Sequence, residues 1–230
     1  EYDAPIIQGW GMTEMSPLGS LSTLRKEVAE KDEATQYAYR AKAGMPVPGV
    51  EARIRTDDGD LAPKDSETMG ELEVRGPWVT DHYHNRPDAN ESSFTDDGWL
   101  RTGDIATMDE YGYLDIVDRT KDVIKSGGEW ISSVDLENEL MAHEAVTEAS
   151  VIAVDHEKWQ ERPMACVVLR DGHEASEAEL QAFLGETFPD WWLPDRIEFV
   201  DAIPRTSTGK FDKKVLRDRF AVVELEESAD

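Results

Sequence analysis

Cysteine is almost absent from this sequence: Cys166 is the only one in 230 residues. One cysteine excludes an internal disulfide and gives no sign of an oxidising compartment. It lies in the apolar run 164–169, where a buried small hydrophobe is a better interpretation than a nucleophile. Long apolar runs are absent too, so the sequence predicts neither a membrane-spanning helix nor a signal peptide.

Basic residues are scarce. The chain carries 50 acidic and 24 basic residues, a formal net charge of −26. Such a field repels nucleic acids and anionic membrane surfaces, so both are poor partners. The acidity has two explanations, a disordered acidic segment or a folded protein adapted to a high-salt cytoplasm, as in a halophile. Seven Trp and regular strand patterns favour the second, and molar salt shortens the Debye length to ~3 Å.

Lysine is the rarer basic residue, with ten Lys in the sequence against fourteen Arg. Five of the ten fall in two short stretches, a concentration that favours specific roles for them. These five are Lys121, Lys125, Lys210, Lys213 and Lys214.

The chain length fits one large domain or two small ones, and residues 118–132 separate two different patterns. This stretch combines opposite charges, two lysines and a Gly-Gly pair, which suits a moving joint that touches an anionic ligand. We therefore predict an α+β protein with a β-rich first part over 1–117, a hinge over 118–122 and a small domain over 123–230. Because the chain begins at Glu1 within what reads as a domain interior, we expect it to be part of a longer polypeptide.

The first part is predicted to be rich in strands. An apolar run over 5–8 predicts a strand that leads into a glycine-flanked turn over 9–14. Residues 49–55 and 70–76 alternate with period two and are predicted to pair in one antiparallel sheet. A loop over 98–104 then precedes a hairpin of strands 105–108 and 113–117.

The second part is predicted to mix helices and strands. Ser132 or Ser133 caps a helix to about Ala142, and the capping box Ser176–Glu179 opens another. The remaining predictions are strands at 149–154, 165–169 and 197–200, a basic helix over 212–220, and an acidic, frayed tail from 224.

Several polar residues are candidates for binding a nucleotide. In 9–14, glycines permit close backbone approach, Trp10 offers a stacking face, Thr13 a hydroxyl and Glu14 a Mg²⁺ ligand. Taken alone, that stretch is better explained as a polar turn with a packed Trp. The carboxylate of Asp104 could accept two ribose hydroxyls, although Asp104 taken alone is better explained as a turn residue.

Lys210 follows a Ser-Thr-Gly run, which gives its long side chain a mobile base. A positioned ammonium group lowers the barrier of substitution at phosphorus by stabilising charge on oxygen. Taken alone, Lys210 is better explained as a surface lysine at the start of a helix.

Four stretches in this order and spacing resemble the adenylate-forming enzymes: acyl-CoA synthetases, adenylation domains and luciferases. They are Gly9–Glu14, Gly98–Asp104, Asp118–Ser132 and Pro204–Lys210. Within the family, the run from Lys125 to Glu137 is most similar to medium- and long-chain fatty acyl-CoA synthetases.

The resemblance implies ATP-dependent activation of a fatty acid to acyl-AMP with release of pyrophosphate, then transfer to CoA with release of AMP. The implied nucleotide contacts are Trp10, Gly11, Thr13, Asp104 and Arg119, with Glu14 on Mg²⁺, Lys121 at the hinge, Lys210 and Lys125 in catalysis, and Gly127 and Gly128 against CoA. The family more commonly has Tyr at the position of Trp10. A lysine on the rim that pairs with CoA phosphates is an equally good explanation of Lys125.

The family's phosphate-gripping loop, rich in Ser, Thr and Gly and ending in Pro-Lys-Gly, does not occur in these residues. We therefore expect the 230-residue chain alone to show weak or no ATP turnover. Two other functions stay open: an adenylation domain that loads a carrier protein, and a non-catalytic acidic binding module. The need for ATP and CoA, with no targeting signal, favours the cytoplasm.

Overall fold

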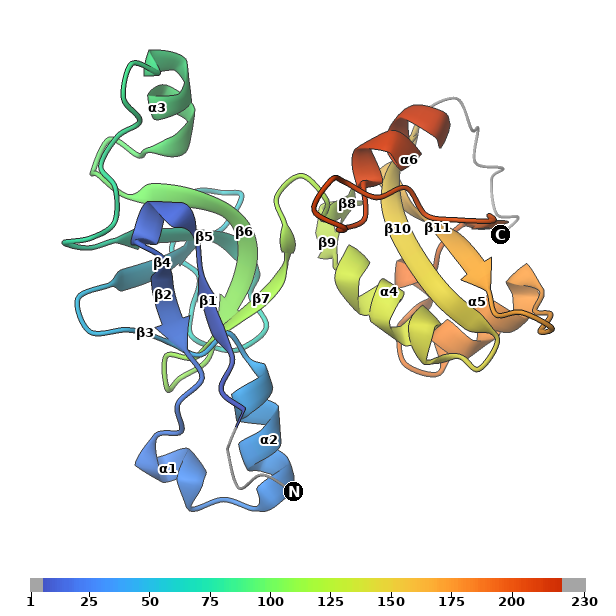
Figure 1. Cartoon of the computed structure of the whole chain (residues 1–230), viewed down its shortest axis with the longest axis horizontal. Coiled ribbons are helices and arrows are strands. Elements are labelled where there is room, and N and C mark those ends of the chain that lie inside the picture. Colours follow the sequence, from blue (N-terminus) through green and yellow to red (C-terminus); the bar gives the residue numbers. More distant parts are fainter. Residues whose placement is uncertain (1–5, 221–230) are drawn as a thin grey trace. The chain divides into compact units, whose positions relative to one another are not determined.

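The structure, a computed structural model, describes residues 6–220 and has a mixed α+β fold (Figure 1). It divides into two compact units, unit 1 (Glu1–Thr120) and unit 2 (Lys121–Asp230). The predicted acidic tail from 224 lies outside the described residues. Within the described chain, no helix has the length and apolar composition needed to cross a membrane.

Unit 1 contains two antiparallel sheets, one with strand order β1-β2-β3 and one with order β4-β5-β6-β7. Its α-helices are short and lie beyond the ends of the strands (Figure 1). The strands are β1 (Gly9–Gly11), β2 (Leu18–Leu21), β3 (Met45–Pro46), β4 (Glu51–Arg55), β5 (Gly70–Arg75), β6 (Leu100–Met108) and β7 (Leu114–Arg119); the helices are η1 (Thr13–Met15), α1 (Lys26–Ala29), α2 (Glu33–Ala41) and α3 (Pro87–Ser93).

The predicted pairing of 49–55 with 70–76 is confirmed, because β4 and β5 pair antiparallel with Glu51 opposite Arg75. The hairpin of β6 and β7 is confirmed as well. The predicted loop over 98–104 is wrong from Leu100 onwards, because β6 already begins there. Pairing with β5 extends the strand backwards, since Leu100 and Arg101 lie opposite Val74 and Glu73.

The predicted strand over 5–8 is also wrong for the described residues 6–8, which form no strand. The strand is instead Gly9–Gly11, which was predicted as a turn. Its residues pair with β2, with Gly9 opposite Leu21 and Trp10 opposite Ser20. The chain reverses only after Gly11, through the short helix η1.

Unit 2 is built on a five-stranded sheet with the order β10-β11-β8-β9, in which β12 pairs parallel to β11. The predicted caps are confirmed: Ser132 accepts from the N–H of Asp135, and Ser176 and Glu179 form a capping box. The strands are β8 (Ile124–Ser126), β9 (Glu129–Ile131), β10 (Val146–His156), β11 (Gln160–Leu169) and β12 (Arg196–Phe199); the helices are α4 (Ser133–Ala142), α5 (Glu177–Gly185), η2 (Asp190–Trp192) and α6 (Lys213–Phe220).

Alternating residues of the unit 2 strands supply two separate cores. Val151 and Ala165 pack with Leu136 of α4 and Leu180 of α5. Their neighbours Ile152 and Cys166 face the other way, into a cluster that contains Leu216 and Phe220 of α6. Because successive strand residues point to opposite faces, α4 and α5 cover one face of the sheet and α6 covers the other.

Cys166 is fully buried in the core under α6, and burial raises the pKa of its thiol to about 12. Burial favours the neutral thiol, so its contribution to the free energy of unfolding is complete below the unfolded pKa near 9. That contribution is lost as the pH rises towards the folded pKa of about 12. We therefore expect the thiol of the native chain to react with a disulfide reagent at pH 8 only through opening of unit 2. Reaction in urea should be complete and fast, whereas fast reaction without urea would contradict the burial of Cys166.

Candidate nucleotide and acyl-transfer sites

Three of the predicted nucleotide contacts form one hydrogen-bonded array in unit 1. The indole Nε1 of Trp10 donates to Oδ2 of Asp104 at 2.9 Å, and Nε of Arg119 lies 3.0 Å from Oδ1 of the same carboxylate. Asp104 and Arg119 are register partners on β6 and β7, while Trp10 comes from the other sheet. An aromatic face, a carboxylate and a guanidinium are therefore presented together.

Burial differs sharply within this array. The side chain of Asp104 is 8% exposed, whereas that of Arg119 is 55% exposed. The backbone of Asp104 is held as well, because its N–H donates to the hydroxyl of Thr102 at 3.1 Å. The carboxylate is thus fixed by its surroundings, while the guanidinium lies at the surface where a ligand can meet it.

The position of Trp10 depends on a glycine that sequence reasoning did not single out. A Cβ atom on Gly19 would lie 2.6 Å from Cζ3 of Trp10 and 2.5 Å from the sulfur of Met15. Only a residue without a side chain fits there. A glycine inside a strand often marks a site where another part of the chain approaches closely, and Gly19 lies inside β2. That position was the signal in the sequence.

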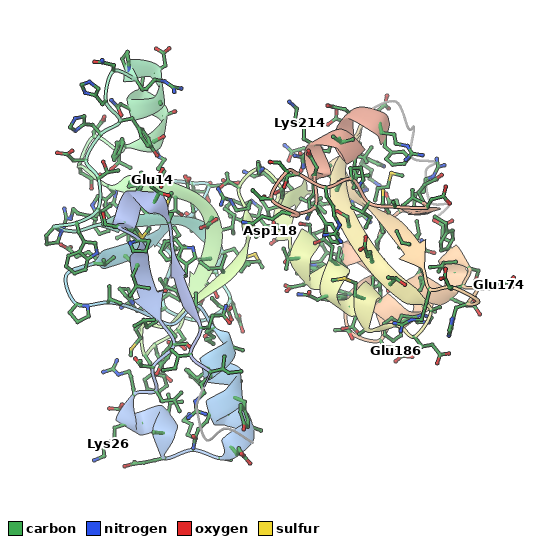
Figure 2. The ribbon with its side chains drawn as sticks, viewed as in Figure 1. Glu14, Lys26, Asp118, Glu174, Glu186 and Lys214 are labelled. Atoms are coloured by element: carbon green, nitrogen blue, oxygen red, sulfur yellow. The ribbon has the colours of Figure 1, made fainter. Side chains whose placement is uncertain are left out.

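Thr13 and Glu14 follow on the short helix η1, and Gly11 and Thr13 are exposed. The hydroxyl of Tyr83 donates to Oε1 of Glu14 at 2.8 Å, and burial and this hydrogen bond both raise the pKa of Tyr83. Glu14 is labelled in Figure 2. Tyr83 was not predicted as a site residue, because no local pattern relates two residues 69 positions apart.

The surroundings of Glu14 show how a Mg²⁺ ion would fit. No group of three or more Asp, Glu, His or Cys side chains suited to a metal occurs within residues 6–220. Mg²⁺ in nucleotide sites is usually held by one or two carboxylates together with phosphate oxygens. Glu14 therefore fits a metal shared with a nucleotide and does not fit an all-protein metal centre.

The two units meet in sequence at Thr120 and Lys121, inside the predicted hinge. Arg119, Thr120 and Lys121 are consecutive exposed residues, in contrast to Asp118, which is 4% exposed. Short runs of exposed residues between compact units are the type of segment from which hinges are drawn. The hinge role of Lys121 stays a prediction.

Gly127 and Gly128 form the turn of the β8–β9 hairpin. Their φ angles are +62° and +91°, as a two-residue hairpin turn of this hand requires. The N–H of Gly127 donates to the carbonyl of Trp159 at 2.9 Å, and the hydroxyl of Ser126 accepts from buried Arg162 at 3.2 Å. The glycine turn is thus exposed, and hydrogen bonds to Trp159 and Arg162 fix its position.

Lys125 lies on the strand that leads into this turn. Its Nζ is 4.9 Å from the centre of the Trp130 ring, a cation–π contact of the kind that holds an ammonium without neutralising it. Its backbone N–H donates to Oε2 of Glu161 at 2.8 Å. Lys125 therefore shares a hairpin with Gly127 and Gly128, as one surface for a ligand would require.

Lys210 lies in a separate loop of unit 2, closed by a bridge between Arg205 and Phe211. The N–H of Thr206 donates to the carbonyl of Lys210 at 2.8 Å, and the N–H of Gly209 donates to the carbonyl of Thr206 at 2.9 Å. The lysine side chain is exposed. Lys210 therefore stands on a compact loop that is separate in sequence from the β8–β9 hairpin.

Two family profiles match the sequence. The profile described as AMP-binding enzyme matches residues 1–84, and the profile described as AMP-binding enzyme C-terminal domain matches residues 135–210. Each profile falls in one of the two units. The chain belongs to the AMP-binding enzyme family, the adenylate-forming enzymes.

Individual relatives are CoA ligases. The chain is 46% identical over 215 residues to the long-chain-fatty-acid–CoA ligase of Thermus thermophilus, which covers 94% of this chain and 40% of that protein. It is 47% identical over 220 residues to the 3-methylmercaptopropionyl-CoA ligase of Ruegeria pomeroyi, which covers 95% of this chain and 40% of that protein. The chain thus spans about two fifths of the length of these relatives.

Among solved structures, ATP-bound MatB from Rhodopseudomonas palustris matches with a TM-score of 0.79 at 31% identity. The match covers 94% of this chain and 41% of that one. That structure of MatB was solved with ATP bound.

Asp104→Ala tests the array in unit 1. The change removes the acceptor of the Trp10 indole and the partner of Arg119, so we expect the free energy of unfolding of unit 1 to fall by about 1–3 kcal/mol. Urea unfolding followed by tryptophan fluorescence measures this effect.

Asp104→Asn is the matched control, because it keeps an acceptor oxygen and should lower the stability less. Labelling of Cys166 reports on unit 2 in the same samples and should not change. Equal stability of the Ala variant and the unsubstituted chain would contradict a structural role for the array.

Proposed function

We propose that the complete polypeptide containing this chain is a fatty acyl-CoA synthetase of the AMP-forming type. The carboxylate of the acid attacks the α-phosphorus of ATP, an acyl-phosphate bond forms, and pyrophosphate leaves. The thiol of CoA, as its thiolate, then attacks the acyl carbon, the bond to the phosphate oxygen breaks, and AMP leaves. These 230 residues would contribute part of the nucleotide site and the small domain that serves both steps.

The observation that carries this proposal is the array of Trp10, Asp104 and Arg119. A purine needs a flat apolar face, ribose hydroxyls need an acceptor, and phosphate needs a cation. One surface of unit 1 offers all three within a connected set of hydrogen bonds. Arg119 is exposed enough to exchange its contact with Asp104 for one with a nucleotide.

Bound Mg²⁺, with Glu14 as its protein ligand, would neutralise part of the phosphate charge. Tyr83 would hold the Glu14 carboxylate in place through its hydrogen bond. Gly11 and Thr13 would approach the nucleotide from the same segment. These assignments extend the family resemblance onto positions whose local geometry suits them.

Unit 2 would serve the two steps with two surfaces. Lys210, on its exposed loop, would stabilise the negative charge that develops on oxygen during adenylation. The hairpin with Gly127 and Gly128 would admit the narrow pantetheine arm close to the backbone, with Lys125 beside it. Rotation at Lys121 would exchange one surface for the other.

The relatives support the proposed reaction class more strongly than they support any particular carboxylic acid as the substrate. The ligases from Thermus thermophilus and Ruegeria pomeroyi are nearly equally identical to this chain, yet their names specify a long-chain fatty acid and 3-methylmercaptopropionate. A fatty acid is our proposed substrate because the Lys125–Glu137 run resembles medium- and long-chain synthetases.

AMP release by the complete polypeptide tests the proposal. The acids to compare are acetate, octanoate, palmitate, benzoate and 3-methylmercaptopropionate, each with and without CoA, in low salt and in concentrated KCl. We expect steady AMP formation only with a fatty acid and CoA together. No AMP with any acid would contradict the proposal, and transfer to a carrier protein in place of CoA would indicate a carrier-loading enzyme.

Lys210→Ala should reduce acyl-AMP formation by about 10²–10³-fold, as expected for loss of one group that stabilises transition-state charge. Nucleotide binding should be nearly unchanged, because the ammonium acts mainly in the transition state. Single-turnover formation of acyl-AMP measures the first effect and calorimetric titration with ATP the second.

Lys214→Ala is the matched control, since Lys214 is an exposed lysine on the adjoining helix α6, labelled in Figure 2. It should retain the full rate. Retention of the rate by Lys210→Ala would remove Lys210 from catalysis.

Lys125→Ala should slow thioester formation from preformed acyl-AMP and leave acyl-AMP formation unchanged. The dependence on CoA concentration separates the two roles open to Lys125. A lower maximal rate at saturating CoA indicates a role in the chemical step, whereas full recovery of the rate indicates binding of CoA phosphates. An equal loss in both steps would contradict a surface specific to CoA.

A further inference from the structure

Strand β10 lies at the end of the strand order of the unit 2 sheet, so it has a strand neighbour on one side only. Edge strands need their outward backbone groups covered. Helix α4 supplies the cover: Oε1 of Glu137 accepts from the N–H of Val151 at 2.7 Å and from the hydroxyl of Ser150 at 3.3 Å. A single carboxylate thus closes the middle of this edge.

The buried carboxylate of Glu137 is balanced by a lysine from the opposite face of the sheet. Nζ of Lys213 lies 2.7 Å from Oε1 of Glu137 and donates to the hydroxyl of Ser133 at 2.6 Å. The two charged side chains are only 11% and 9% exposed. Because α4 and α6 cover different faces, this ion pair joins the two helices around the edge of β10.

This ion pair lies next to the loop that carries Lys210. The loop is closed by its own backbone hydrogen bonds, so its orientation depends on what holds its two ends. At the start of the loop, Arg205 binds Glu148 of β10 at 2.6 Å, but the two side chains are 46% and 29% exposed, which weakens the pair. After the loop, Lys213 is the first deeply buried polar anchor, three residues beyond Lys210.

The same helix is tied to the start of unit 2. One turn beyond Lys213, NH1 of Arg217 donates to Oδ1 of Asp122 at 2.8 Å. Asp122 is the residue after Lys121, the predicted hinge. Helix α6 therefore connects the segment where unit 2 begins with the edge of β10. The loop that carries Lys210 leads directly into this helix, which begins at Lys213.

We propose that Lys213 is a positioning residue for Lys210: its ion pair with Glu137 fixes the start of α6 and thereby the direction from which Lys210 reaches the acyl-phosphate. This inference rests on the proposed function. It assigns no contact with substrate to Lys213, and it distinguishes Lys213 from its neighbour Lys214, which is exposed.

The test uses Lys213→Met and Glu137→Gln, singly and together, in the complete polypeptide. Lys213→Met alone leaves a buried charge without its lysine and risks misfolding. The double variant removes both charges and keeps an acceptor oxygen for Val151, so it should fold. We expect acyl-AMP formation by the folded double variant to fall about 10–100-fold, the size of effect that a small misplacement of a catalytic group produces.

Thioester formation from preformed acyl-AMP is the internal comparison, because the proposed function gives Lys210 no role in that step. The Arg217–Asp122 contact, two residues before β8, is unchanged in these variants. Thioester formation should change by less than about 3-fold, a difference small compared with the positioning effect. Leu180→Ala is the control for stability alone, since Leu180 is buried in α5 on the face away from α6. It should lower the melting temperature and leave both steps intact at 25 °C.

A second measurement does not depend on activity. Amide hydrogen exchange of the 230-residue chain should quicken in 204–211 in the double variant, because the loop loses its anchor. In Leu180→Ala the exchange of this loop should stay unchanged relative to the rest of unit 2.

Four outcomes are informative. Selective loss of acyl-AMP formation with faster exchange in the loop supports the inference. Equal losses in both steps, or an unchanged rate of acyl-AMP formation while Lys210→Ala is inactive, overturn it and leave the proposed function standing. No acyl-AMP from the unsubstituted enzyme removes the proposed function and this inference with it.

Discussion

Burial of the Glu137 charge is the constraint on which the architecture of unit 2 depends. A buried carboxylate is unfavourable unless hydrogen-bond donors and an opposite charge surround it. Here a backbone N–H, a hydroxyl and the ammonium of Lys213 provide both. Because these donors come from β10 and α6 while Glu137 belongs to α4, satisfying one carboxylate fixes the relation of three elements.

Unit 1 uses a carboxylate in a different way. Asp104 is buried too, but one of its partners is the half-exposed guanidinium of Arg119. An ion pair of that kind contributes little to stability and can be exchanged for a ligand. The contrast explains why Asp104 is a candidate for binding and Glu137 for structure, although both are acidic residues on regular secondary structure.

The sequence predicted elements that depend on neighbouring residues. The caps at Ser132 and Ser176 and the alternation in β4 and β5 need only local information, and the structure confirms them. The assignment of Gly9–Gly11 to a turn was wrong because β2, its partner, was not predicted. The Lys213–Glu137 ion pair could not be predicted for the same reason, since no local sequence pattern shows that two helices meet at the edge of a sheet.

Part of the candidate site could also be predicted from the sequence. The order of the four stretches indicated the family, and Trp10, Asp104 and Arg119, named separately, lie together in the structure. Tyr83 and Gly19 were missed because their effects act through space. The roles of Lys210, Lys125, Lys121 and the two hairpin glycines stay predictions, as does adaptation of the acidic surface to high salt.

In the proposed reaction a carboxylate oxygen attacks the α-phosphorus of ATP. The direct measurement supplies the complete polypeptide with a fatty acid whose carboxylate carries oxygen-18, together with ATP and CoA, and determines the mass of the products. Adenylate chemistry transfers one labelled oxygen to AMP when the thiol displaces it. AMP without label, or label in inorganic phosphate, would contradict this proposal.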